Sequence, residues 1–154
     1  MKKVLLIVGS MYPMDRIVKE IDAQANKKRI EVFAQIGDSA YLPKNIKYAK
    51  FLPEEKLIEK MRWADVVITH AGAGTIILAL SSKKRIILVP RLKEHGEAVD
   101  DHQIELCRAM KNKYGINFVL DEKELRKEIE KSGANIYARN KMKLASEIRR
   151  IIEL

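Results

Sequence analysis

The sequence predicts an α/β fold, an open Rossmann-like parallel sheet with helices on both faces. Short apolar runs, such as those at 3–8, 66–69 and 85–89, recur along the chain and are separated by longer amphipathic stretches. Strands that are apolar throughout are typical of parallel sheets covered on both faces. The 154 residues suffice for one buried core, so we expect a single domain over residues 1–154.

The first half of the chain alternates expected strands and helices. Pro53 is suited to the first turn of a helix, because its fixed φ is helical and the N–H it lacks has no partner there. The expected elements are a strand at 3–8, a helix at 14–25, strands at 31–36 and 46–52, and a helix at 53–63.

The second half continues this alternation. Pro90 ends an apolar run, and Gly115 stands just past a helical stretch, where glycine commonly ends a helix. The expected elements are a strand at 66–69, a helix at 75–82, a strand at 85–89, a helix at 99–113, a strand at 116–120 and two closing helices.

Composition indicates a globular protein, with 47% hydrophobic and 33% charged residues. The net charge of +9 favours anionic partners, but the basic residues are scattered and aromatic residues make up only 6% of the chain. We therefore expect no nucleic-acid partner and rank a basic nucleic-acid module last among the alternatives. A single cysteine fits a reducing compartment. Without a bilayer-spanning run or a recognisable signal peptide, the expected location is the cytoplasm.

The segment "HAGAGT" at 70–75 follows an expected strand and opens a helix. There Gly72, Ala73 and Gly74 would bring backbone N–H groups and the positive end of the helix against an anion such as a phosphate. The segment is neither a nicotinamide fingerprint, which needs a third glycine where Ile77 stands, nor a Walker loop. On spacing alone, a tight turn without a ligand explains the glycines equally well.

A second polar loop, "RLKEHGEAVDDHQ" at 91–103, follows the strand that Pro90 ends. Its last residues, from Asp101, fall at the start of a helix, and by themselves they favour a capped, solvated helix start. The three histidines, His70, His95 and His102, lack the short spacing of a zinc site, so we expect no metal.

The segments "MRWADVVITHAGAGTIILAL" and "IILVPRLKEHGEAVDDHQIELCRAM" resemble the carboxyl-terminal domain of family 28 glycosyltransferases. The opening "VGSMYPMDRIVKEID" and "EVFAQIGDSAYLPKNIKYAKFLP" resemble its single-domain members, so the similarity covers residues 1 to about 109. Those members are donor-binding subunits of two-part N-acetylglucosaminyltransferases in lipid-linked oligosaccharide synthesis, and their exopolysaccharide counterparts. The resemblance implies the C-terminal half of a GT-B glycosyltransferase, a hexosyltransferase that needs no cofactor or metal.

Family positions carry over to particular residues of this chain. Two loops would hold the diphosphate of a UDP-sugar: Gly9, Ser10, Gly72, Ala73, Gly74 and Thr75. The resemblance also places the uracil at Phe51 and Leu52, and the sugar hydroxyls at His102 and Gln103. Further candidates are His70, Glu94 and Asp101.

A partner should complete the site, because a transferase of this type has two nucleotide-fold domains and one fits in this length. The resemblance implies that the general base and the lipid-linked acceptor belong to a membrane-anchored subunit, which would hold the chain at the inner membrane face. An apolar and basic stripe along residues 136–152 could dock that subunit, although packing on its own sheet explains most of it.

Two departures from the family pattern lie beside the expected nucleotide. Leu78 stands where relatives carry a ribose-binding Glu, and "SSKKR" replaces a Gly-Lys-Pro-like turn. Either Leu78 weakens donor binding, or a nearby acid such as Glu94 or Glu97 takes over the ribose. The alternative function is therefore a non-catalytic nucleotide-binding or scaffolding subunit.

Overall fold

The structure, a computed structural model, describes residues 1–9, 11–27, 29–131, 146, 149 and 150. The strands are β1 (Lys2–Ile7), β2 (Ile30–Gln35), β3 (Lys47–Ala49), β4 (Val66–His70), β5 (Arg85–Val89) and β6 (Asn117–Phe118). The helices are α1 (Asp15–Asn26), α2 (Glu54–Trp63), α3 (Ala73–Ser81), α4 (His102–Tyr114) and α5 (Leu125–Glu130). Two short 3-10 turns are η1 (Lys93–His95) and η2 (Glu122–Glu124).

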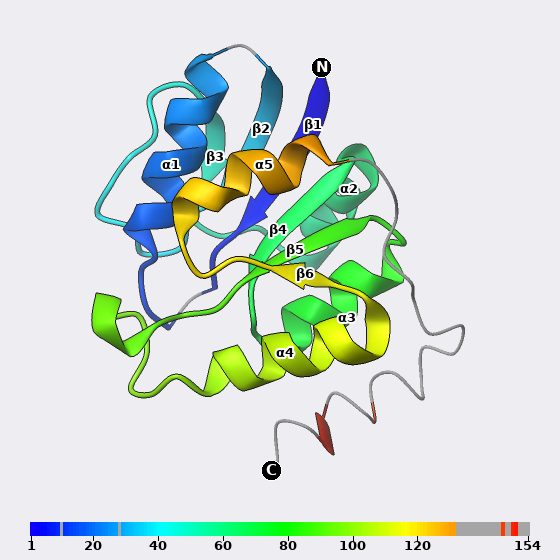
Figure 1. Cartoon of the computed structure of the whole chain (residues 1–154). Coiled ribbons are helices and arrows are strands. Elements are labelled where there is room, and N and C mark those ends of the chain that lie inside the picture. Colours follow the sequence, from blue (N-terminus) through cyan, green and yellow to red (C-terminus); the bar gives the residue numbers. More distant parts are fainter. Residues whose placement is uncertain (10, 28, 132–145, 147–148, 151–154) are drawn as a thin grey trace.

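The strands form one sheet in the order β3-β2-β1-β4-β5-β6, and every neighbouring pair is parallel. The chain builds outward from β1 to β3, crosses back to β4 on the other side of β1, and then builds outward to β6 (Figure 1). The predicted open parallel α/β fold is confirmed. In such sheets, ligands bind beyond the carboxyl ends of the strands where the order reverses, here between β1 and β4.

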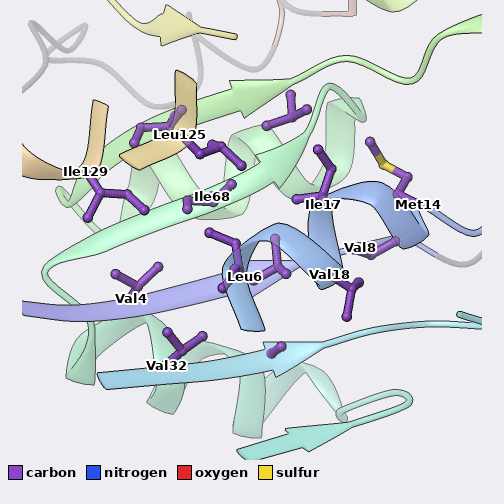
Figure 2. Packing of buried hydrophobic residues seen from close by; sticks show 14 of the residues in the cluster. Val4, Leu6, Val8, Met14, Ile17, Val18, Val32, Ile68, Leu125 and Ile129 are labelled. Atoms are coloured by element: carbon purple, nitrogen blue, oxygen red, sulfur yellow. The ribbon is translucent and has the colours of Figure 1, made fainter. Parts of the chain in front are cut away.

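Each face of the sheet has its own apolar core. Successive side chains of a strand point to opposite faces, so Leu5 and Ile7 of β1 join one cluster while Val4 and Leu6 join the other. The first cluster packs the sheet against α2, α3 and α4. The second packs it against α1 and α5, with Leu125 of α5 among its members (Figure 2). This double burial explains why the strands are apolar throughout.

Several predicted boundaries differ from the structure. The strand predicted at 46–52 is shorter, because pairing with β2 covers only Lys47–Ala49. The helix predicted from residue 99 begins at His102, since residues 99–101 form a bend and Asp101, the N-cap, has non-helical dihedral angles. The strand predicted at 116–120 is only Asn117–Phe118, the two residues that pair with β5. The last predicted helix and most of the stripe at 136–152 lie outside the described residues.

No helix connects the parallel strands β2 and β3, although a helix is the usual crossover between such strands. The buried carboxylate of Asp22 in α1 fixes this connection. It accepts hydrogen bonds from the backbone N–H groups of Lys44 and Asn45 and from the hydroxyl of Tyr41. Among the helices of the described chain, none combines the length and apolar character needed to cross a membrane.

Candidate functional site

A cleft of about 450 Å³ opens where β1, β4 and β5 end, at the point where the strand order reverses. It is built from three separate segments, which begin at Gly9, His70 and Arg91. The structure thereby brings together residues that the sequence predicted separately. Those that line the cleft are Gly9, His70, Gly72, Ala73, Gly74, Thr75, Glu97 and Gln103.

The imidazole of His70 lies between two of these glycines. A Cβ atom added at Gly9 would stand 2.4 Å from Nε2 of His70, and one added at Gly72 would stand 2.3 Å from its Cε1. No side chain tolerates contacts that short. The absence of a side chain at Gly9 and Gly72 therefore makes room for the ring of His70.

Gly74 has the opposite environment, because a Cβ atom added there would meet nothing within 4 Å. Gly74 is exposed and lies in the first turn of α3, whose N-cap, Gly72, makes no side-chain capping hydrogen bond. The first N–H groups of a helix have no partner within it, and they carry its partial positive charge. The amino end of α3 thus presents free donors to open space in the cleft.

His70 is held as a neutral imidazole. Burial, together with the neighbouring positive charge of Arg91, lowers the pKa of His70 to about 4. Its buried Nδ1 has no hydrogen-bond partner among the described residues. At neutral pH the ring can offer a ligand one donor or one acceptor without adding charge.

Arg91 is a functional candidate that the sequence reading did not single out. It follows Pro90 at the end of β5, is 3% exposed, and lines the cleft. Burial lowers the pKa of its guanidinium, and the negative charge of Glu97 opposes that shift. Its position directly after an expected strand could have indicated it from the sequence, since the carboxyl edge of a parallel sheet carries the ligand site in such folds.

Gln103 joins two of the segments that form the cleft. Its side-chain oxygen accepts hydrogen bonds from the backbone N–H of Ala71, at 3.2 Å, and of Arg91, at 2.9 Å. The oxygen is therefore occupied within the protein. Only the amide NH₂ group of Gln103 remains to meet a ligand such as a sugar hydroxyl.

Other predicted residues stand outside the lining of the cleft. Phe51 and Leu52 follow β3 at the same edge of the sheet, Phe51 half-exposed and Leu52 donating its backbone N–H to Gln35. His102 is half-exposed at the start of α4, beside Glu105. Glu94 and Asp101 line a neighbouring hollow of about 470 Å³, and Ser10 lies outside the described residues.

Glu97, considered above as a substitute ribose ligand, is 2% exposed and already paired. Arg16 of α1 donates hydrogen bonds to both of its carboxylate oxygens. Within the described part of the chain, no three His, Cys, Asp or Glu side chains are grouped closely enough to hold a metal ion. A further hollow of about 320 Å³ lies against Lys2, Arg29 and Arg126, and none of the predicted site residues lines it.

Comparison with known proteins identifies a family for most of the chain. Residues 4–154 match the glycosyltransferase family 28 C-terminal domain. One similar protein is the UDP-N-acetylglucosamine–N-acetylmuramyl-(pentapeptide) pyrophosphoryl-undecaprenol N-acetylglucosamine transferase of Geobacter metallireducens. It is 31% identical to this chain over 134 residues, and the match covers 82% of this chain and 33% of that protein. Another is UDP-N-acetylglucosamine transferase subunit ALG13 of Mus musculus, 26% identical over 71% of this chain and 10% of that protein. The chain thus spans about a third or less of these two relatives.

The solution structure of ALG13 shares the fold. The two structures superpose with a TM-score of 0.63 at 14% sequence identity, and the match covers 96% of this chain and 94% of the other. At that identity the similarity shows the fold alone. It extends over nearly the whole of both chains.

Proposed function

Because the chain belongs to the glycosyltransferase family 28 C-terminal domain family, we propose that it is the donor-binding subunit of a two-part glycosyltransferase. It binds a UDP-sugar, N-acetylglucosamine or a related hexose, while a partner subunit binds a lipid-linked acceptor. The names of the relatives support this proposal. One is a transferase of N-acetylglucosamine from UDP to an undecaprenol-linked acceptor, and another is a subunit of a UDP-N-acetylglucosamine transferase.

The observation that carries the proposal is the open amino end of α3 in the cleft. Gly74 leaves space for a ligand next to the first N–H groups of the helix, and Thr75 adds a hydroxyl donor in the same turn. A helix N-terminus of this kind favours a phosphate, through hydrogen bonds and through the helix dipole. A UDP-sugar offers two phosphoryl groups to such a site.

The residues of the cleft would act on the leaving group of the transfer. The acceptor hydroxyl attacks the anomeric carbon and gives its proton to a base on the partner. The bond between that carbon and the β-phosphate oxygen breaks, and UDP departs with the electron pair. Backbone donors at Ala73 and Gly74 face the place where this charge increases, and fixed donors of that kind lower the barrier without moving.

The partner supplies what one nucleotide-fold domain lacks. In this proposal it is a membrane-anchored protein with a second domain of that kind, and it holds the chain at the cytoplasmic face of a membrane. The product is a lipid-linked oligosaccharide or an exopolysaccharide precursor. A neighbouring gene for a protein with one membrane-anchoring helix and such a domain would identify the partner.

Calorimetric titration of the purified chain with UDP, with ADP and GDP as controls, tests donor binding. Transfer from radiolabelled UDP-N-acetylglucosamine to a polyprenyl-diphosphate-linked acceptor, measured with and without the partner, tests the two-part arrangement. We expect UDP to bind in preference to ADP and GDP, and transfer to require both subunits. Absence of UDP binding contradicts the proposal, and rapid transfer by the chain alone contradicts its two-part form.

Leu78 supports a second candidate, a scaffolding subunit with weak donor affinity. It lies one helical turn beyond Gly74 on α3 and packs against the first apolar cluster. A leucine cannot accept a hydrogen bond from a ribose hydroxyl. The same titration separates the two functions, because a scaffold binds UDP weakly or not at all and still increases the activity of its partner.

A further inference from the structure

Arg91 has an unusual environment for a buried arginine. It is 3% exposed, and its Nε, Nη1 and Nη2 atoms are all buried without a hydrogen-bond partner among the described residues. A guanidinium carries five N–H donors and keeps its charge at any ordinary pH. Burial of such a group without a partner costs far more free energy than burial of an apolar side chain.

Glu97, whose charge acts on Arg91, forms no hydrogen bond with it. The carboxylate of Glu97 accepts two hydrogen bonds of 2.9 Å from Arg16 and a third, of 3.2 Å, from the backbone N–H of Leu92. It attracts Arg91 only at longer range, without a hydrogen bond between the two groups. The local structure therefore neutralises Arg16 and leaves the charge of Arg91 for another group.

The cleft is where that group would bind. Arg91 lines it together with the amino end of α3, and its Nη2 lies 3.1 Å from the position that a Cβ at Gly9 would take. Two independent sources of positive charge, a guanidinium and a helix terminus, thus face one cavity of about 450 Å³. His70 beside them stays neutral and does not compete for an anion.

We propose that Arg91 binds a phosphoryl group of the donor's diphosphate and serves as the charged partner of that group in the cleft. This inference rests on the proposed function and deepens it, because it names the side chain that receives the leaving diphosphate. The planar guanidinium can bind a phosphoryl group through two parallel hydrogen bonds, and the free N–H groups of α3 take the other phosphoryl group. The buried, unpaired charge is then a feature of the ligand-free chain only.

The proposal predicts that replacing Arg91 raises the stability of the ligand-free chain and weakens ligand binding. Arg91→Met removes a buried charge that has no hydrogen-bond partner in the part of the chain that the structure describes, and it keeps a similar volume. We expect the melting temperature of the ligand-free variant to rise by about 2 °C or more. Its affinity for UDP and for inorganic pyrophosphate should fall about 10- to 100-fold. Arg91→Lys keeps the charge without the planar fork and should retain part of the affinity.

Arg85 offers a matched control at the other end of β5. It is also buried, but Glu128 pairs with it at 3.2 Å, and it does not line the cleft. Arg85→Met should lower the melting temperature by about 4 °C or more, because it removes the ion pair with the side chain of Glu128 and the hydrogen bond to the backbone oxygen of Glu128. Its affinity for UDP should match that of the parent.

The experiment combines differential scanning calorimetry of the ligand-free proteins with titration of UDP and inorganic pyrophosphate. The inference is overturned if Arg91→Met binds UDP as tightly as the parent, or if it loses as much stability as Arg85→Met. If the parent binds pyrophosphate through Arg91 but shows no preference for UDP, the anion site stands and the proposed function fails. If the parent binds neither ligand, both are overturned.

Discussion

Arg16 of α1 and Glu97 of the loop before α4 form a doubly hydrogen-bonded ion pair, with both bonds at 2.9 Å. The same guanidinium donates to the backbone oxygens of Pro90 and Leu120. A helix on one face of the sheet is therefore tied to the loop that forms one wall of the cleft. Residues such as Arg91, on that loop, are held in place by contacts that no ligand has to provide.

The substitution Glu97→Gln should lower the free energy of unfolding by about 2 kcal/mol, because it removes the charge that receives two hydrogen bonds from the buried guanidinium of Arg16 and leaves Glu122 as its ion-pair partner. Urea denaturation monitored by circular dichroism measures this change. Glu59→Gln is the control, since Glu59 pairs with Lys56 at 3.0 Å on the exposed surface of α2. Its effect should stay within about 0.5 kcal/mol. Equal losses in the two variants would contradict the structural role of the Arg16 pair.

Gly9→Ala and Gly72→Ala should each destabilise the fold by about 1–3 kcal/mol, because the new methyl group meets the ring of His70. Combining either substitution with His70→Ala should restore most of the loss, since the clashing ring is then absent. A double-mutant cycle in urea measures the coupling. Independent, additive effects would show that the ring of His70 is not the reason why these two positions require glycine.

Gly74 should respond differently, because its surroundings are open. Gly74→Ala should stabilise the chain by about 0.5–1 kcal/mol through the helix propensity of alanine. Gly74→Val should abolish UDP binding while the chain remains folded, since the branched side chain fills the approach to the amino end of α3. Circular dichroism and calorimetric titration test both variants. A folded Gly74→Val that binds like the parent would mean that the loop is only a turn.

Acid should destabilise the protein through His70. The pKa of His70 in the folded protein, about 4, lies below its ordinary value of 6.5. Between these two pH values His70 binds a proton in the unfolded chain but not in the folded one. The contribution of the neutral His70 to the free energy of unfolding is fully present above pH 6.5 and is lost as the pH falls toward 4. Between pH 7 and pH 5 the loss amounts to about 2 kcal/mol.

Urea denaturation at these two pH values tests the role of His70. His70→Gln should reduce the difference in unfolding free energy between them by about 2 kcal/mol. His102→Gln, at the exposed start of α4, should leave the wild-type acid sensitivity in place. An unchanged difference in His70→Gln would show that the imidazole takes up its proton in the folded protein as easily as in the unfolded one.

Leu78→Glu should strengthen UDP binding about 10- to 100-fold, because a carboxylate can accept hydrogen bonds from the ribose hydroxyls and leucine cannot. The titration compares UDP with its 2′,3′-dideoxy analogue, and only the affinity for UDP should increase. Ile77→Glu is the matched control, since Ile77 is its neighbour on α3 and packs against the same cluster. A folded Leu78→Glu that gains nothing would show that the family's ribose contact does not transfer to this position.

The pattern of apolar runs was enough to predict the parallel sheet, because strands buried on both faces leave that signature. It could not predict how short β3 and β6 are. The length of an edge strand depends on which residues find a partner across the sheet, and neither local sequence nor hydropathy records that. The start of α4 was misplaced for a related reason. The bend at residues 99–101 could not be foreseen from a polar stretch that also fits the first turn of a helix.

The site was predicted in part. The loop at 70–75 carries a glycine spacing that the sequence shows directly, and the structure places it in the cleft. Arg91 stands after a predicted strand, but what distinguishes it is burial without a hydrogen-bond partner among the described residues, and burial is a property of the assembled fold. The same holds for Gly9, whose contact with His70 joins segments about sixty residues apart.

The side-chain oxygen of Gln103 accepts the backbone N–H of both Ala71 and Arg91. Each of these hydrogens is therefore shielded from solvent exchange by the same atom. When the Gln103 side chain swings away, both hydrogens become exposed in a single event. In deuterated water Ala71 and Arg91 should show closely similar protection factors, although they belong to different strand ends. Replacement of Gln103 by Ala should make both exchange fast together, because one side-chain oxygen protects a backbone hydrogen in each of two segments that form the cleft.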